Sequence, residues 1–171
     1  MRQESNTKTT LEKARPDPSL RAQIVSRIIT FGALFQRPMT LGVRGLVLDA
    51  EDRVLLVRHT YVPGFYLPGG GVERGETMLQ ALTRELQEEG AVHLLSAPTL
   101  HNVYLNRRVS PRDHVALYVV RHFGYDGPRE PDHEIAEAAF FPLTALPDGI
   151  TPATRARLAE VLAGEPVSPY W

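Results

Sequence analysis

The chain contains no cysteine among its 171 residues. Disulfides and thiolate metal sites are therefore excluded, and a reducing compartment, the cytoplasm, is the expected location. The N-terminal stretch MRQESNTKTTLEKARPDPS is polar and lacks the apolar core of a signal peptide. No stretch reaches the roughly 18 uninterrupted apolar residues that a membrane-spanning helix needs, so no membrane partner is expected.

An excess of charge of either sign is also missing. The chain carries 19 basic and 20 acidic residues, for a net charge of -1. Duplex nucleic acids and anionic membranes attract proteins through clustered basic charge, so this balance gives no reason to expect either partner. What the chain does have is a hydrophobic share of 43%, enough for the core of one domain with some extension.

The order of hydrophobic and turn-forming segments predicts a mixed α/β or α+β fold. Residues 1–38 are expected to form a polar N-terminal tail plus an appended amphipathic helix, and residues 39–171 a single domain. The segments with strand patterns in that domain are 40–49, 53–59, 92–106, 113–125 and 134–143. The segments with helical patterns are 77–90 and 151–164, the latter with Thr151 as its cap and Gly164 as its stop.

The appended helix, residues 19–35, carries one apolar stripe: Ile24, Ile28, Phe31 and Phe35. Each large apolar side chain gains roughly 1.5–3 kcal/mol on burial, so the stripe needs a partner. The sheet of the same chain, a second copy and a membrane surface are the three candidates. Basic residues are few on this helix, which disfavours the membrane. Two-fold dimers are the commonest oligomers, which favours a homodimer through this helix.

The stretch RELQEEG, residues 84–90, concentrates negative charge on one predicted helix. Glu85, Glu88 and Glu89 are three and four residues apart, and each like-charge neighbour costs roughly 0.2–0.5 kcal/mol. They lie near the helix C-terminus, where the macrodipole is already negative. Glu85 and Glu89 lie on the shoulder of an apolar arc formed by Leu79, Leu82 and Leu86, and Glu88 lies a little further round. Partly desolvated carboxylates need a counter-charge, which a hard cation such as Mg²⁺ supplies. A solvated acidic face is the alternative when this pattern is taken alone.

The wider stretch GGVERGETMLQALTRELQEEGAV resembles the signature box of the Nudix hydrolases. That box reads Gly, five residues, Glu, seven residues, Arg-Glu, an aliphatic, any residue, Glu-Glu, any residue, Gly and an aliphatic. One fixed position departs from the pattern, because Ala91 stands where the last glycine is expected and Gly90 comes one place earlier. The positions that match are Gly70, Glu76, Arg84, Glu85, Glu88 and Glu89. The likeness extends over roughly residues 40–146.

The resemblance implies an α/β/α sandwich around a mixed β-sheet. It implies Mg²⁺ or Mn²⁺ as cofactor, with ligands from the box: the Gly70 carbonyl, Glu85, Glu88 and Glu89. Glu76 and Arg84 would pair and fix the loop against the helix. An arginine holds a carboxylate with two parallel hydrogen bonds, and glycines let a backbone approach a phosphate or metal closely.

The implied activity is metal-dependent hydrolysis of the diphosphate linkage in a nucleoside diphosphate joined to another moiety, by water attack on phosphorus. A carboxylate that is not consumed in ligation takes the proton of the water. Glu88 and Glu89 are candidates within the box. Glu134 and Glu137 are candidates from a later loop, and an exposed loop charge is the alternative interpretation of Glu134.

The substrate is less well defined by the sequence. Tyr61 and Phe65 are candidates for stacking on a base, although packing is the commoner role of such aromatics. Arg107 and Arg108 are candidates for a terminal phosphate, with a solvated basic loop as the alternative. A non-catalytic Nudix-fold ligand-sensing or regulatory module is the second functional hypothesis. An isopentenyl diphosphate isomerase of the same fold would be expected to need a cysteine, which is absent.

Overall fold

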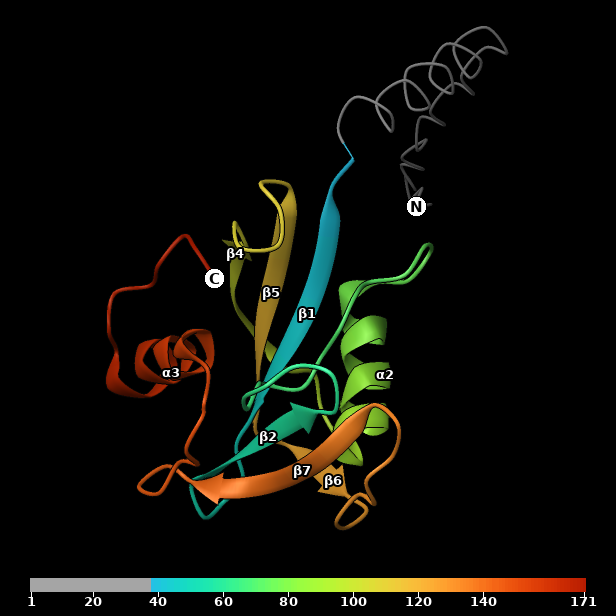
Figure 1. The fold of residues 1–171 in the computed structure, drawn as a ribbon, viewed down its shortest axis with the longest axis vertical. Coiled ribbons are helices and arrows are strands. Elements are labelled where there is room, and N and C mark those ends of the chain that lie inside the picture. Colours follow the sequence, from blue (N-terminus) through green and yellow to red (C-terminus); the bar gives the residue numbers. More distant parts are fainter. Residues whose placement is uncertain (1–37) are drawn as a thin grey trace, which may run out of the picture. The chain divides into compact units, whose positions relative to one another are not determined.

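The computed structural model describes residues 38–171 (Figure 1). The predicted N-terminal tail and helix, and with them the homodimer expected through that helix, lie outside the described residues. The predicted domain boundary after residue 38 stays a prediction. Within residues 38–171, no helix is both long enough and apolar enough to cross a bilayer.

The strands form a mixed arrangement, as the sequence predicted. In chain order they are β1 Thr40–Val47, β2 Arg53–His59, β3 Val92–Leu94, β4 Thr99–Leu105, β5 Asp113–Val120, β6 Phe123–Tyr125 and β7 Ile135–Pro142. In the three-stranded sheet, β5 lies between β1 and β4, parallel to β1 and antiparallel to β4. Two antiparallel pairs complete the set, β2 with β7 and β3 with β6.

Two of the predicted strands are broken, each into two pieces. The segment predicted at 92–106 gives β3 and β4, and the segment predicted at 113–125 gives β5 and β6. Residues 95–98, between β3 and β4, lie opposite residues 121–122, between β5 and β6. The two connections differ in length, so the strand pairing is interrupted there. Pro98 has no N–H to donate to the ladder, while Leu95 N still donates to the His122 carbonyl at 3.1 Å. One long hairpin therefore becomes two short ladders.

The acidic helix, α2, spans Met78–Gly90 and begins with a capping box. Gln80 N donates to the Thr77 hydroxyl at 3.2 Å, and Thr77 N donates to the Gln80 side-chain oxygen at 2.9 Å. Leu79, expected on the buried arc, is 42% exposed, and Ala81 joins Leu82 and Leu86 on the buried face instead.

The end of α2 explains the shifted glycine of the box. Gly90 is still helical, and a Cβ there would lie 2.6 Å from the Leu55 side chain, so the helix needs a glycine to pack on β2. Ala91 then takes the left-handed conformation, with φ 52°. Glycine adopts that conformation without steric cost, whereas alanine does so only with strain.

The closing helix, α3, spans Pro152–Leu158 and continues as the π-helical turn η1, Ala159–Ala163. Thr151 caps it by accepting a hydrogen bond from Thr154 N at 3.2 Å. Gly164 ends it with φ 68°. Both ends lie where the sequence predicted them.

Figure 1 shows α2 and α3 on opposite sides of β1, and the alternation of β1 side chains explains why. Val43 and Val47 are buried in the cluster that contains Leu82 and Leu86 of α2. Leu46 and Leu48 are buried in the cluster that contains Leu158 of α3. A strand covered on both faces is apolar on both faces. The α/β/α sandwich implied by the family resemblance is thus confirmed.

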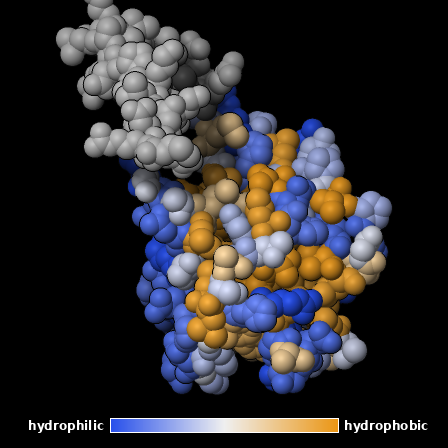
Figure 2. Space-filling model, turned by 180° about the vertical axis from the view of Figure 1, so that it is seen from behind, coloured by the Kyte–Doolittle hydropathy of each residue, from blue (hydrophilic) through white to orange (hydrophobic). Residues whose placement is uncertain are grey.

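The rear of the domain remains partly apolar at its surface. Figure 2 shows hydrophobic side chains gathered over the middle of that face, with hydrophilic ones along its margins. On the edge strand β4, Leu100 and Val103 are 45% and 41% exposed. A large apolar share is ordinary for the surface of a folded domain.

Candidate active site

The three box glutamates of α2 occupy very different environments. The side chain of Glu88 is 61% exposed, that of Glu85 13% and that of Glu89 only 7%. Glu85 and Glu89 are therefore turned toward the interior, in agreement with their predicted place on the shoulder of the apolar arc, whereas Glu88, predicted a little further round, faces solvent.

Arg84 neutralises the outer carboxylates. Its guanidinium contacts Glu76 Oε1 at 3.1 Å, Glu85 Oε1 at 2.8 Å and Glu88 Oε2 at 3.3 Å. Its Nη2 also donates to the Gly71 carbonyl at 3.2 Å. The hydrogen bonds to Glu76 and Glu85 raise the pKa of Arg84, and the bond from Arg84 lowers the pKa of Glu76. The Glu76–Arg84 pair that the sequence predicted is present, and it ties the glycine loop to α2.

Glu89 is the carboxylate that Arg84 does not reach. Its Oε2 accepts a hydrogen bond from Gly69 N at 2.7 Å, and its Oε1 lies 3.7 Å from His59 Nε2. Burial raises the pKa of Glu89 to about 7, although the Gly69 hydrogen bond acts in the opposite direction. This buried carboxylate is the group in the cluster that most needs a positive partner.

His59, at the end of β2, was not among the residues singled out as functional from the sequence. It is buried, its pKa is lowered by burial and by Arg44, and its Nδ1 has no hydrogen-bond partner. Donor atoms of His59, Glu89 and Glu134 all lie within 4.8 Å of one another. A neutral imidazole with an open nitrogen thus stands beside the buried carboxylate. Its only signal in the sequence is its position shortly before the glycine loop.

Glycines of the loop are required where the backbone passes the carboxylates. A Cβ on Gly70 would lie 2.2 Å from Glu85 Oε1, and one on Gly69, whose φ is 138°, would lie 2.1 Å from the Val43 carbonyl. The Gly70 carbonyl itself accepts a hydrogen bond from Val43 N at 2.9 Å. Its predicted role as a metal ligand would need its second lone pair and stays a prediction.

The loop before β7 brings Glu134 to the same place from the opposite side. Arg129 Nε donates to the Glu88 carbonyl at 2.5 Å, and Arg129 Nη2 pairs with Asp132 at 2.6 Å. The Arg129 hydrogen bond and two backbone N–H donors hold the pKa of Asp132 well below its usual value. The charge pattern of the box contains no hint of Arg129, because this arginine reaches the end of α2 only through the fold.

The two loop glutamates named from the sequence are separated by the structure. Glu134 is exposed, and the Tyr61 hydroxyl donates to it at 3.5 Å. Glu137 pairs with Arg58 at 3.0 Å. Only Glu134 lines the pocket with the α2 carboxylates. That pocket, about 420 Å³, is lined by Arg84, Glu85, Glu88, Glu89, Arg129, Asp132, Glu134 and Ile135.

The residues proposed for substrate contact are scattered. Tyr61 is 70% exposed and stands beside Glu134. Phe65 is buried, and its ring packs edge-on against Phe141, so it belongs to the core and is not brought to the carboxylates. Arg107 stacks on the Tyr170 ring at 3.9 Å. Arg108 lines a different pocket, described below.

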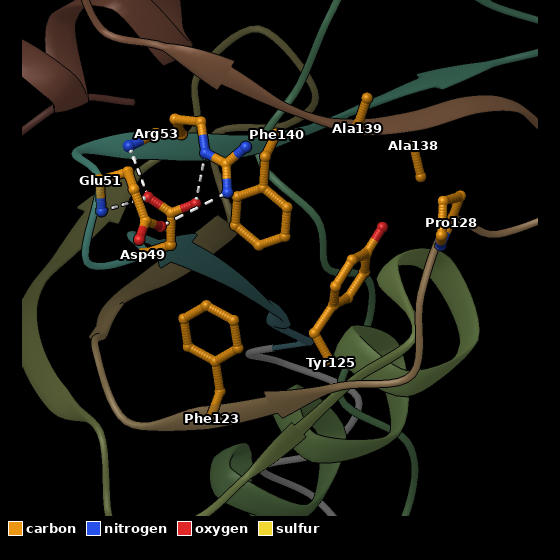
Figure 3. Close-up of a pocket in the computed structure, with 9 residues that line it drawn as sticks. All are labelled: Asp49, Glu51, Arg53, Phe123, Tyr125, Pro128, Ala138, Ala139 and Phe140. Atoms are coloured by element: carbon orange, nitrogen blue, oxygen red, sulfur yellow. Dashed lines mark hydrogen bonds and ion pairs between the residues drawn. The ribbon is translucent and has the colours of Figure 1, made fainter.

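A pocket of about 400 Å³ near β6 and β7 offers a contrast (Figure 3). Its walls are the rings of Phe123, Tyr125 and Phe140, and both of its carboxylates pair with Arg53, Asp49 at 2.7 Å and Glu51 at 3.4 Å. This pocket has no cluster of under-neutralised carboxylates, so it is not the candidate active site.

Comparison with known proteins agrees with this geometry. The family model of the NUDIX domain matches residues 38–162. The chain belongs to the Nudix family. Its carboxylate pocket is therefore built by the Nudix box and by a loop of the same Nudix domain.

Two curated Nudix relatives are informative. The chain is 33% identical over 104 residues to an ADP-ribose pyrophosphatase of Methanocaldococcus jannaschii, covering 59% of this chain and 61% of that protein. It is 31% identical over 126 residues to the 8-oxo-dGDP phosphatase NUDT18 of Homo sapiens, covering 71% of this chain and 38% of that protein. The chain thus spans less than two thirds of the length of either relative.

A solved Nudix structure has the same fold. The crystal structure of a MutT NUDIX hydrolase from Burkholderia pseudomallei aligns with a TM-score of 0.61 and 26% identity. The alignment covers 71% of this chain and 97% of that one.

Proposed function

We propose that this protein is a metal-dependent Nudix pyrophosphohydrolase. It would cleave the diphosphate linkage of a nucleoside diphosphate joined to another moiety, by attack of water on phosphorus. The observation that carries the proposal is the buried Glu89, which has no arginine partner among residues 38–171 and lies in a pocket that also holds Glu85, Glu88 and Glu134.

The donor set fits a hard divalent cation. Carboxylate oxygens are the ligands that Mg²⁺ and Mn²⁺ prefer, and the pocket supplies them from two sides, α2 and the loop before β7. We assign the ligand role to Glu85, Glu88 and Glu89. When bound, such a cation neutralises diphosphate charge and makes a coordinated water more acidic.

Glu134 is the residue we assign as general base. It faces the pocket from the wall opposite α2, and no arginine lies within ion-pair distance of it among residues 38–171. A carboxylate that is not consumed in ligation can accept the proton of the attacking water, which contributes typically about 10²–10⁴-fold to rate. The Tyr61 hydroxyl and the backbone contact of Glu134 N with Asp132 hold the side chain at the pocket rim.

The substrate class follows from the relatives. ADP-ribose and 8-oxo-dGDP both contain a nucleoside diphosphate, and the relatives are named for acting on them. We propose a small nucleoside diphosphate derivative as substrate and no duplex nucleic acid partner. The cytoplasmic location and the homodimer stay predictions. A sensing module without hydrolysis is less favoured, because every carboxylate of the box is retained.

The test compares glutamate-to-glutamine changes at three positions. Wild type is first screened with Mg²⁺ and with Mn²⁺ on ADP-ribose, nucleotide sugars, dinucleoside polyphosphates, oxidised nucleotides and capped RNA ends. Glu88→Gln should lose Mn²⁺ affinity and lower kcat by orders of magnitude. Glu134→Gln should lower kcat about 10²-fold or more while it still binds Mn²⁺. Glu137→Gln, the matched control, should keep near-normal activity because Glu137 is paired with Arg58 away from the pocket.

Mn²⁺ binding is measured by calorimetry, and rates are measured on the best substrate. Near-normal turnover of Glu88→Gln would overturn the metal assignment. Loss of Mn²⁺ binding in Glu134→Gln would make that residue a ligand instead of the base.

A further inference from the structure

A pocket of about 430 Å³ is lined by residues of the glycine loop and of α3. Tyr66 and Leu67 of the loop line it, two to three residues before Gly69, which holds Glu89. Arg44 lines it too and donates to the Leu67 carbonyl at 2.9 Å. The volume is within the range of roughly 300–1,000 Å³ that small-molecule sites occupy.

The far wall of this pocket is Trp171, which comes from a segment after the closing helix. Leu105 N donates to the Pro169 carbonyl at 3.0 Å, and Trp171 N donates to the Leu105 carbonyl at 3.2 Å. The segment thus pairs in parallel with the end of β4 through a single β-bridge between Leu105 and Tyr170. The family match ends at residue 162, so this wall does not come from the part of the chain that matches the NUDIX domain.

A buried polar network fixes that segment in place. Arg157 Nη2 pairs with Glu160 at 2.6 Å, and the Tyr104 hydroxyl donates to Glu160 at 2.7 Å. From this pair, Arg157 Nη1 donates to the Tyr170 carbonyl at 2.9 Å, and Ser168 N donates to Glu160 at 2.9 Å. Backbone atoms on both sides of the segment are held by side chains of α3 and η1.

The Trp171 side chain is only half-buried. One side packs edge-on against Tyr104 at 5.5 Å, with the Arg157 guanidinium 5.5 Å from the ring centre. Trp171 lines the pocket together with Arg44 and Tyr66. A large, rigid aromatic surface is thus presented to a cavity beside the diphosphate site.

We propose that Trp171 is a specificity-determining residue, whose ring packs against a planar heteroaromatic ring of the substrate. This inference rests on the proposed function, which puts the diphosphate at the α2 carboxylates and leaves the neighbouring pocket for the nucleobase. Stacking of a base on an aromatic side chain tolerates different bases, because every base has a π-face. Trp171 therefore selects nucleobase-bearing diphosphates as a class.

The chain itself carries the reporter for the test, because Trp171 is its only tryptophan. Intrinsic fluorescence is measured on the full chain during titration with AMP and, separately, with ribose 5-phosphate and inorganic pyrophosphate. AMP should change the emission saturably, whereas the two ligands that lack a base should not. A tryptophan that merely supports the fold would not distinguish these ligands.

Variants then measure what the ring contributes. By calorimetry, Trp171→Ala should weaken AMP binding about tenfold, which is within the range typical for one stacked base, and Trp171→Phe should retain most of the affinity. The affinity for ribose 5-phosphate should stay unchanged in both. Val167→Ala, on the same segment but 48% exposed and outside this pocket, is the matched control and should change AMP binding less than about twofold.

Two outcomes would overturn the inference. One is a Trp171 emission that does not change at saturating AMP, and the other is an AMP affinity that is equal in wild type, Trp171→Phe and Trp171→Ala. If the protein hydrolyses nucleoside diphosphates but the Trp171 emission does not change on AMP binding, this inference is wrong and the proposed function stands. An AMP-specific fluorescence change without hydrolysis of any substrate would support the binding role of Trp171 and overturn the proposed function. If Trp171→Ala does not fold, the wild-type fluorescence titration still decides.

Discussion

The carboxylate pocket and the Trp171 pocket are similar in size, about 420 and 430 Å³, but they are built in different ways. Most charged groups of the first come from a single box of the sequence. The second combines β1, the glycine loop, the β4–β5 loop, α3 and the terminal segment. The chemistry of a phosphate site is thus encoded locally, whereas the surface that would select the rest of a substrate is assembled from distant parts.

The two regions also treat buried charge differently. Glu89 is buried with one backbone donor and a distant imidazole, so its charge remains under-neutralised. Glu160 is equally buried, but Arg157, Tyr104 and Ser168 all donate to it. A buried carboxylate with too few positive or hydrogen-bonding partners is suited to bind a cation. A carboxylate whose hydrogen bonds are all made is suited to hold neighbouring segments in place.

The largest expected effect comes from breaking the buried polar network of Arg157 and Glu160. Arg157→Met would leave Glu160 buried without its cation, which typically costs about 3–5 kcal/mol. We expect the free energy of unfolding, measured by urea denaturation, to fall by that amount. The carboxylate pocket should be unaffected, so Mn²⁺ affinity of the folded fraction should not change.

A double variant serves as the control. Arg157→Met with Glu160→Leu removes both charges, and replacement of a buried ion pair by apolar groups is often close to neutral. Recovery of most of the lost stability would show that the stranded charge caused the loss. A double variant as unstable as Arg157→Met alone would instead point to the Tyr170 and Ser168 contacts.

The next effect concerns Glu89 and its dependence on pH without metal. Burial raises its pKa to about 7 in the folded protein, against 4.5 for the free group. The folded state therefore binds more protons than the unfolded state between these values. Stability from neutral Glu89 is fully present below pH 4.5 and is lost as pH rises through 7, by about 3 kcal/mol in total.

Glu89→Gln removes this titration while it keeps an oxygen for the Gly69 N–H. With a chelator present, the difference in melting temperature between the variant and wild type should grow in favour of the variant from pH 4.5 to pH 7.5. A difference that is constant across this range would show that Glu89 does not titrate there.

The smallest effect lies at the end of α2. Ala91 has φ 52°, a conformation that costs a non-glycine residue about 1–2 kcal/mol. Because glycine also loses more backbone entropy on folding, Ala91→Gly should raise the free energy of unfolding by about 1 kcal/mol, with unchanged activity. Gly90→Ala is the contrasting variant and should destabilise, since its Cβ would lie 2.6 Å from Leu55. Thermal melts measure both.

Local rules predicted the helices well. The start of α2 at Thr77 and the end of η1 at Gly164 follow from side-chain caps and from left-handed glycine, which involve neighbours in the chain. The broken strands were not predicted, because the interruption at 95–98 depends on what faces it across the hairpin. For Phe65 the sequence left stacking on a base and packing open, because its packing on Phe141 is a contact between distant segments.

The sequence by itself determined the family, the box and its three helical glutamates, since fixed spacing on one helix sets their neighbourhood. The family resemblance also implied that Arg84 and Glu76 pair, which the structure shows at 3.1 Å. Only the tertiary structure decided that Glu89 is the deeply buried carboxylate, that His59 and Glu134 approach it, and that Arg129 rather than a residue of the helix caps the end of α2. Burial and long-range contacts depend on how separate segments pack, which no local pattern specifies. The place of Trp171 beside the glycine loop is the clearest case, because residues distant in the chain share one pocket.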